Sequence, residues 1–240
     1  MTAKPQNSLM KLGTKKSFDE TGTSYPCISN FKNSQYLFYT GWSQRGKEPF
    51  LNTLGYAKFN DRLKKIGPIY LNSNLGSIRE IGSIEIKEFN DTHFMFFTQF
   101  NKWQSNSPTY NIRAAKSHDV NSWTLDKSFN FDEIDEISSM ICRPSVLMYK
   151  SEYFMFFCHR KKDMDYKIGL ASSANFYDWT LRSKDIFEKI PPQDWCKDGQ
   201  AYPHVHYDSQ TDDCYLFFAG NSYGRDGFGV LHFNLYDLTA

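Results

Sequence analysis

The feature that most constrains this chain is a pattern of strands that recurs four times. Each copy opens with an extended segment, and a turn and an aromatic strand follow it. The aromatic strands recur at intervals of 58, 59 and 62 residues, and their first aromatic residues are Tyr36, Phe94, Tyr153 and Tyr215. A period of this length, with no helix pattern inside it, predicts the blades of an all-β propeller.

The apolar runs inside the repeats support this fold class. A propeller blade packs against a blade on either side, so its strands should be continuously apolar and not alternate with polar residues. The runs YLFY, FMFF, YFMFF and YLFF have this character and are rich in aromatic residues that suit buried sheets. A large β-sandwich also has short strands at regular spacing. The fourfold recurrence of the whole unit favours the propeller.

We therefore expect one propeller domain over residues 1–240, with blade units at 19–78, 79–138, 139–196 and 197–240. The inner strands should start near Pro26, Ser83, Pro144 and Pro203, and helices should be short. The last unit has no room for a fourth strand. Since an open sheet edge invites aggregation, residues 1–18 are expected to supply a closing strand, with 8–14 pairing, or to be the remnant of another blade.

Composition excludes several classes of protein. The net charge is +1 and the basic residues are scattered, which argues against a nucleic-acid or membrane surface. No run of about 20 apolar residues occurs and the first residues lack a signal-peptide pattern, so no membrane insertion is expected. The five cysteines are odd in number and widely spaced, which indicates reduced core thiols of a cytoplasmic protein. No cofactor is expected.

Acidic residues recur just ahead of the predicted inner strands. Glycoside hydrolysis needs two facing carboxyl groups, about 6.5–9.5 Å apart for inversion or about 5–5.5 Å for retention. Solvated loop carboxylates are the alternative for any one of these residues, but their recurrence favours a functional set. The catalytic candidates are Asp19, Glu80, Glu136 and Asp198. Glu20 is the alternative to Asp19 and is also a candidate for substrate binding, and Asp135 is the alternative to Glu136.

Two arginines form a second candidate group, since Arg143 opens an inner strand and Arg160 follows the neighbouring strand. Guanidinium groups suit sugar carboxylates, phosphates and vicinal hydroxyls. The alternative is a structural ion pair with Asp163, Asp165 or Glu136.

The remaining candidates would contact a sugar. Trp42, Trp103 and Trp195 lie where an exposed indole could stack on a sugar ring, whereas Trp123 and Trp179 are expected to pack between blades. Asn221 belongs to the glycine-rich GNSYGRDGFG loop, which no helix follows as in a phosphate loop. His204 is a hydrogen-bonding or acid–base candidate. Together with His206 and His159 it could suggest a metal, but the spacing is weak support and no metal is expected.

Several motifs resemble a known family. They are FDETG (18–22), YLFYTGW (36–42), YNIRAAKSHDVNSW (110–123), ICRPSV (141–146), YKIGLASS (166–173) and the GNSYGRDGFG loop (220–229). In this order they are similar to the five-bladed propeller superfamily of arabinanases, β-xylosidases and invertases, above all to uncharacterised bacterial relatives found with surface-polysaccharide genes. The resemblance implies a saccharide ligand and three funnel carboxylates. The resemblance also implies that four of the five blades are visible here, and that the usual base is absent if the missing blade is the family's first.

Two functions follow as hypotheses. The chain is a glycoside hydrolase or glycosyl-transferring enzyme that uses funnel carboxylates, or it is an inactive glycan-binding or scaffold propeller in polysaccharide biosynthesis. The sequence leaves open the sugar, the stereochemical course and the pairing of two chains into a homo-oligomer that hides unfinished blades.

Overall fold

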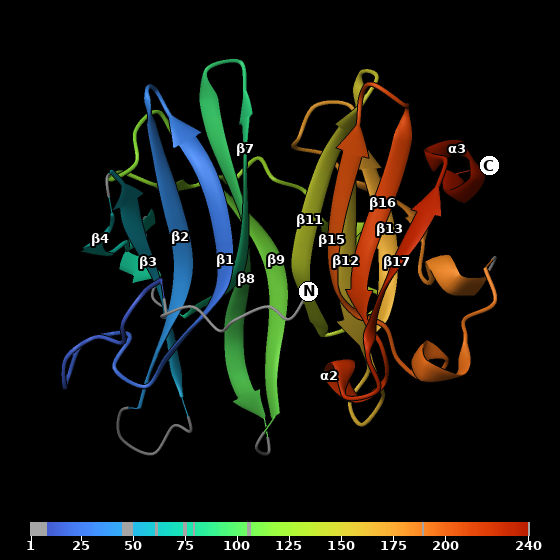
Figure 1. Cartoon of the computed structure of the whole chain (residues 1–240), viewed down its shortest axis with the longest axis horizontal. Coiled ribbons are helices and arrows are strands. Elements are labelled where there is room, and N and C mark those ends of the chain that lie inside the picture. The colour runs from blue at the N-terminus through green and yellow to red at the C-terminus, as the bar shows by residue number, and fades with distance from the viewer. Residues whose placement is uncertain are drawn as a thin grey trace, which may run out of the picture.

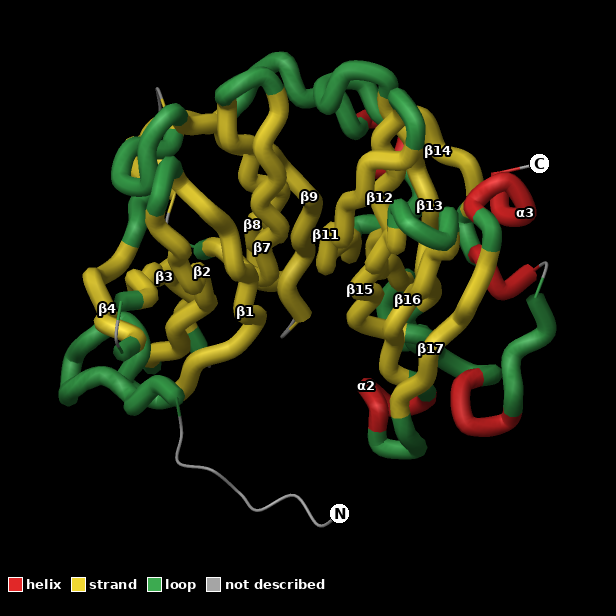
Figure 2. Tube along the Cα trace, turned by 45° about the horizontal axis from the view of Figure 1, so that its top comes forward, coloured by secondary structure: helices red, strands yellow, loops and turns green. Residues whose placement is uncertain are grey.

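Four groups of mainly antiparallel strands stand side by side in the computed structural model, which describes residues 9–44, 50–60, 62–73, 76–78, 80–104, 107–188 and 190–239 (Figure 1). We call these groups blades 1 to 4. One parallel bridge, between Tyr110 and Met140, joins blades 2 and 3 into a single sheet. Figure 2 shows the blades as an arc, with blades 1 and 4 at its two ends. The all-β prediction is confirmed, because sheets make up most of the structure and the helices are short. No sheet in the described part of the chain closes on itself.

The blades follow one another in chain order. Blade 1 contains β1 (Gly22–Phe31), β2 (Ser34–Ser43), β3 (Leu51–Phe59) and β4 (Leu63–Pro68). Blade 2 contains β7 (Ile81–Phe89), β8 (Thr92–Gln104), β9 (Ser107–Ser117) and β10 (Thr124–Leu125), and β5 (Leu71–Ser73) with β6 (Gly76–Ile78) extends its outer edge. Blade 3 contains β11 (Met140–Tyr149), β12 (Glu152–Arg160), β13 (Lys167–Ser173) and β14 (Thr180–Ser183). Blade 4 contains β15 (Ala201–Asp208), β16 (Asp213–Ala219) and β17 (Phe228–Phe233).

Helices are confined to the connections and the end of the chain. They are α1 (Asp132–Asp135), α2 (Asn221–Gly224), α3 (Leu235–Thr239) and two 3₁₀ turns at Ile186–Glu188 and Asp194–Cys196. No helix in the described ranges is long and apolar enough to cross a membrane.

The first strand of each blade lies beside the first strand of the next, so that β1, β7, β11 and β15 line a common axis. Three apolar layers fill the space between successive blades. Trp123 is buried between blades 1 and 2, and Trp179 between blades 2 and 3, as the sequence predicted. Each indole donates a hydrogen bond to the carbonyl three residues earlier, Trp123 to Val120 at 3.1 Å and Trp179 to Phe176 at 3.0 Å. The repeat therefore extends to individual hydrogen bonds.

The segment before β1 lies against blade 1. The Phe18 ring stacks on Tyr39 with 5.8 Å between centroids, in space left by two glycines: a Cβ atom on Gly55 would lie 2.5 Å from the Phe18 ring. Residues 9–21 contain no strand, and within the described residues the last sheet ends at β17. The expected closing strand over 8–14 is thus not found at 9–14, and residue 8 lies outside the described ranges. Phe18 holds this segment on blade 1, away from β17.

Blade 4 has one uncovered face. Residues on β16 and β17 alternate between the layer shared with blade 3 and the surface, where Phe217, Val230 and Phe228 are 39%, 50% and 77% exposed. Blades 2 and 3 bury both faces, whereas this last blade buries one. The five cysteines are buried and unpaired.

The glycine-rich loop supports a structural prediction about Trp195. A Cβ atom on Gly229 would lie 2.6 Å from the Trp195 ring, too close for both to stay in place. We expect Gly229→Ala to lower the free energy of unfolding by about 1–3 kcal/mol, the usual cost of overpacking. Urea denaturation measures this change. Gly22→Ala is the matched control, because its nearest contact would be an ordinary 3.5 Å to Trp42. Equal stability of the two variants would contradict the prediction.

Candidate functional site

Every first strand carries a β-bulge near its start. The pairing shifts by one residue between Ser24 and Cys27, and the same shift recurs in β7, β11 and β15. The bulged pairs are Tyr25-Pro26, Gly82-Ser83, Arg143-Pro144 and Tyr202-Pro203. The strands therefore begin before the prolines that were expected to start them. A bulge leaves a residue outside the ladder of hydrogen bonds, so proline is tolerated inside the strand.

The bulges turn three side chains to the axis. Tyr25, Arg143 and Tyr202 have left-handed backbone φ angles of 56°, 60° and 59°. Such angles cost about 1–3 kcal/mol for residues other than glycine and persist only where surrounding contacts enforce them. The contacts are found at the axis, where the guanidinium carbon of Arg143 lies 3.4 Å from the centre of the Tyr25 ring and 4.3 Å from that of Tyr202. This Tyr–Arg–Tyr stack joins blades 1, 3 and 4 by cation–π contacts.

Side chains of the preceding blade hold these bulges. The Thr40 hydroxyl donates to the Gly82 carbonyl at 2.9 Å, the Arg143 amide donates to Thr98 Oγ1 at 3.3 Å, and the Tyr202 amide donates to Cys158 Sγ at 3.2 Å. Thr40, Thr98 and Cys158 each directly follow the aromatic run of their repeat, and Ala219 does so in blade 4. The repeat thus contains a polar contact from each of the first three blades to the next.

A pocket of about 470 Å³ opens at the end of the axis where the first strands begin, and we call it the axial pocket. Its volume is in the range of small-molecule sites. Aromatic rings and two guanidinium groups dominate the lining: Trp42, Phe50, Phe100, Tyr25, Tyr110, Tyr166, Tyr202, Tyr223, Arg143 and Arg160. No aspartate or glutamate lines it among the residues that the structure describes.

Arg160 is held on the wall of this pocket. Its Nη1 donates to the Tyr223 hydroxyl at 3.0 Å, and its guanidinium carbon lies 4.9 Å from the centre of the Tyr166 ring. The Tyr166 hydroxyl in turn hydrogen bonds to the hydroxyl of Tyr110 from blade 2. All four blades therefore contribute to one arrangement of arginines and tyrosines.

Asn221 positions this wall. Its side-chain oxygen accepts hydrogen bonds from the amides of Asp198 and Gly199 at 3.0 and 3.1 Å, and its nitrogen donates to the Asp194 carbonyl at 2.9 Å. The side chain is buried, and it fixes the left-handed turn that carries Tyr223, whose φ is 61°. Both the oxygen and the nitrogen of the Asn221 amide thus bind backbone groups. The predicted contact of Asn221 with substrate stays a prediction.

Burial keeps two phenols of the axial pocket, Tyr110 and Tyr202, neutral. Burial raises the pKa of Tyr110 to about 12 and that of Tyr202 to about 12. Burial also raises the pKa of the Cys142 thiol, but a hydrogen bond with Cys158 and the nearby charge of Arg143 offset this, and the Cys142 pKa lies below its ordinary value. Cys142 lines the axial pocket.

The predicted carboxylates lie in other places. Asp19 is buried beside blade 1, where it accepts from the Tyr39 hydroxyl at 3.1 Å and pairs with Lys65. Glu20 accepts from the Lys16 amide at 2.6 Å in the same segment. Glu136 and Asp198 are exposed and outside the axial pocket. Asp135 pairs with Arg113 at 2.8 Å.

Glu80 comes nearest to the axial pocket. It lines a small hollow with Phe50 and Phe100, two residues that also line that pocket. The catalytic roles of all these carboxylates stay predictions.

The other candidates divide between two hollows. Trp42 lines the axial pocket and donates from Nε1 to Ser24 Oγ at 2.5 Å. His204 lines a second hollow of about 490 Å³, farther along the first strands, which shares Arg143 and the two stacked tyrosines with the axial pocket. Trp103 lies on β8, but its side chain is outside the described part. No group of three potential metal ligands occurs among the described residues.

Sequence reasoning missed the tyrosines. Tyr25-Pro26 and Tyr202-Pro203 occupy the position of Arg143-Pro144 in their repeats, so an available signal was the recurrence of a large residue followed by proline.

Comparisons with known proteins agree with this architecture. No protein-family model matches the chain. Two uncharacterised proteins from strains of Mycobacterium tuberculosis are each 26% identical over 236 residues, which cover 94% of this chain and 76% of theirs. The chain is also similar to solved structures of a glycoside hydrolase (TM-score 0.66, 13% identity) and of an α-L-arabinofuranosidase from Lactobacillus brevis (TM-score 0.63, 10% identity). The matches cover 91% and 89% of this chain and 71% and 72% of theirs.

The chain thus shares the fold of these glycoside hydrolases. This likeness defines the fold, and the chemistry must be argued from the site.

The polar contacts between blades support a stability prediction. Thr98→Val keeps the side-chain shape but removes the hydroxyl that contacts Ser83 at 2.9 Å and the Arg143 amide at 3.3 Å. We expect a loss of about 1–3 kcal/mol in the free energy of unfolding, because buried polar groups lose a partner. Ala219→Thr places a hydroxyl at the same repeat position on the uncovered face and should change stability by less than about 0.5 kcal/mol. Chemical denaturation of both variants tests the pair, and a neutral Thr98→Val would contradict it.

Proposed function

We propose that this protein binds a saccharide in the axial pocket. The observation that carries the proposal is a pocket of about 470 Å³, lined by aromatic rings and two arginines, on the axis of a glycosidase-type propeller. Aromatic rings stack on the apolar faces of sugars, while phenols and guanidinium groups donate hydrogen bonds to sugar oxygens. Trp42 and the tyrosines supply the first kind of contact, and Arg143 and Arg160 the second.

Binding without hydrolysis is the better-supported form of this function. Hydrolysis by the usual route needs two facing carboxyl groups, and the described lining of the axial pocket contains none. Hydrolysis remains a second candidate because Glu80 contacts the hollow next to the axial pocket. In that case Glu80 would be one of the two carboxylates.

We further propose that the arc corresponds to four blades of a five-bladed ring. Two observations support this: blade 4 has an uncovered apolar face, and the chain spans 76% of its uncharacterised relatives and 71% of the glycoside hydrolase structure. A further sheet against that face would bury Phe228 and Val230 as the other blades bury theirs.

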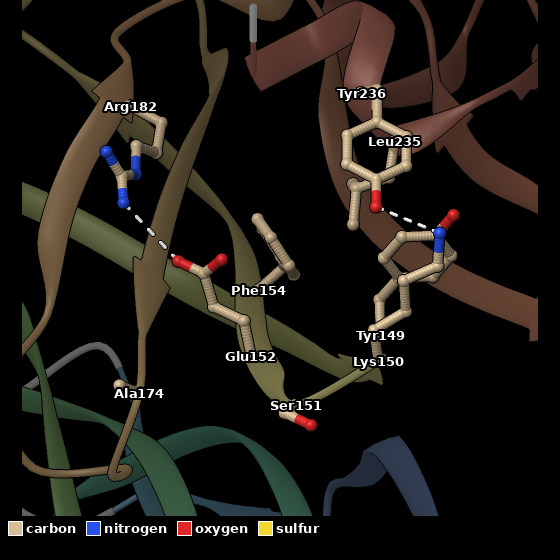
Figure 3. A pocket seen from close by; sticks show the side chains of 9 residues that line it. All are labelled: Tyr149, Lys150, Ser151, Glu152, Phe154, Ala174, Arg182, Leu235 and Tyr236. Carbon is tan, nitrogen blue, oxygen red and sulfur yellow. Dashed lines mark hydrogen bonds and ion pairs between the residues drawn. The ribbon is translucent and has the colours of Figure 1, made fainter.

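A binding experiment tests the saccharide proposal. We expect the wild-type protein to bind at least one member of a broad glycan panel, and Trp42→Ala to weaken that binding about five- to tenfold through loss of a stacking surface. The control is Tyr236→Ala. Tyr236 is half exposed in a separate groove of about 550 Å³, where Lys150 donates to its hydroxyl at 2.9 Å (Figure 3). The control should bind the glycan as the wild type does.

Turnover separates the two forms of the function. Incubation with aryl glycosides and with the bound glycan should release no sugar if the protein only binds. If the wild type turns over a substrate and Glu80→Gln abolishes turnover, the hydrolase candidate replaces simple binding. Absence of binding across the panel would overturn the proposed function.

A further inference from the structure

We infer that the ligand of the axial pocket is an anionic saccharide, whose phosphate or carboxylate group is bound by Arg143 and Arg160. This inference rests on the proposed function and names its ligand class.

Neither arginine has a carboxylate partner in the described part of the chain. Ion pairs within 4.0 Å do form at other arginines: Arg113 pairs with Asp135, Arg182 with Glu152 and Arg225 with Asp226. The two arginines of the axial pocket form no such pair with any described residue, including the Asp163, Asp165 and Glu136 considered from the sequence. Two positive charges thus line one pocket. The carboxylate of Glu85 lines the adjoining hollow with Arg143, but it pairs with Lys87 at 2.8 Å, so an anionic ligand would supply the countercharge that the arginines lack.

Tyr110 and Tyr202, two tyrosines beside the arginines, do not supply that charge. The raised pKa values of Tyr110 and Tyr202, about 12 each, keep these phenols protonated at neutral pH. They act as hydrogen-bond donors that add to the preference for an anion. The Cys142 thiol is the remaining acidic group, and as a thiolate it would balance at most one of the two charges.

The geometry leaves donors of both arginines free for a ligand. The Tyr25 and Tyr202 rings both pack against the Arg143 guanidinium, and no described acceptor bonds to its N–H groups. Arg160 donates from Nη1 to Tyr223, and its Nε is buried without a partner among the described residues. Planar guanidinium edges match the oxygens of phosphate and carboxylate groups.

The groove in Figure 3 is a useful contrast. It also contains two basic residues, but Arg182 points toward Glu152, with 3.3 Å between Nη2 and Oε1, and Lys150 donates to Tyr236. Both cations there have protein partners. In the axial pocket, by contrast, Arg143 and Arg160 have no carboxylate partner among the described residues.

Calorimetric titration of the whole chain tests the inference. The probes are glucose, glucose 6-phosphate, glucuronate and inorganic phosphate. We expect at least one anionic sugar to bind about tenfold or more tightly than glucose, and its affinity to fall as salt is added, because charged hydrogen bonds carry the difference. The phosphate and uronate probes distinguish the two sources of the anion.

Substitutions assign the effect to the site. Arg160→Gln should reduce the preference for the anionic sugar to about threefold or less, and Arg160→Lys should restore it in part, since lysine keeps the charge but not the planar fork. Arg143→Gln should act in the same way, but Arg143 also supports the stack, so the Arg160 variants decide if that protein fails to fold. Arg182→Gln is the matched control and should leave both affinities unchanged.

The outcomes separate the two proposals. If glucose or another neutral sugar binds as tightly as its anionic counterpart and Arg160→Gln changes neither, the anionic ligand is refuted while saccharide binding stands. If inorganic phosphate binds in an Arg160-dependent way and no sugar adds affinity, the anion site is supported and the saccharide function fails. If none of the probes and no member of the glycan panel binds, both fail.

Discussion

The bulge at the start of each first strand is the constraint on which the rest of the structure depends. An ordinary strand would point successive side chains to alternate faces, into the layers between blades. One extra residue breaks this alternation and directs Tyr25, Arg143 and Tyr202 to the axis instead. Because hydroxyl or thiol groups of the preceding blade hold the bulged backbone, the stack forms only when neighbouring blades are in place. The site is therefore a product of blade assembly and not of any single sheet.

Two kinds of interaction, apolar packing and polar contacts, hold the blades together. Away from the axis, apolar layers that include Trp123 and Trp179 give a non-directional stabilisation proportional to buried area. Near the axis the contacts are polar and directional, so they fix the rotation of one blade against the next. The hydroxyls of Thr40 and Thr98 act here, and they place the arginine and tyrosine side chains more narrowly than apolar packing could. In blade 4, whose outer face is uncovered, the residue after the aromatic run is Ala219, which has no hydroxyl or thiol group.

The sequence predicted what depends on local pattern and failed where register or tertiary fit decides. The aromatic period defined the repeat, and Trp123 and Trp179 pack between blades as their repeated position indicated. The strands were expected to start near Pro26, Pro144 and Pro203, and they start two to four residues earlier because the bulge accommodates each proline. Which acidic residue reaches the axis depends on how its segment docks: Asp19 follows Phe18 onto blade 1 because Gly41 and Gly55 leave room for that ring. No sequence pattern in the segment that carries Phe18, or in the strands that carry Gly41 and Gly55, predicts that fit.

The positive charge of the axial pocket explains why a chain with the fold of glycoside hydrolases need not hydrolyse glycosidic bonds. A general acid must keep its proton near neutral pH, so its pKa has to be raised by burial or by neighbouring negative charge. A carboxyl group brought into this pocket would meet Arg143 and Arg160, whose positive charges favour the ionised form. It could serve as a base or nucleophile, but it would be a weak acid catalyst for a leaving sugar. The two arginines thus favour an anionic ligand and disfavour the proton donor that glycosidic cleavage requires.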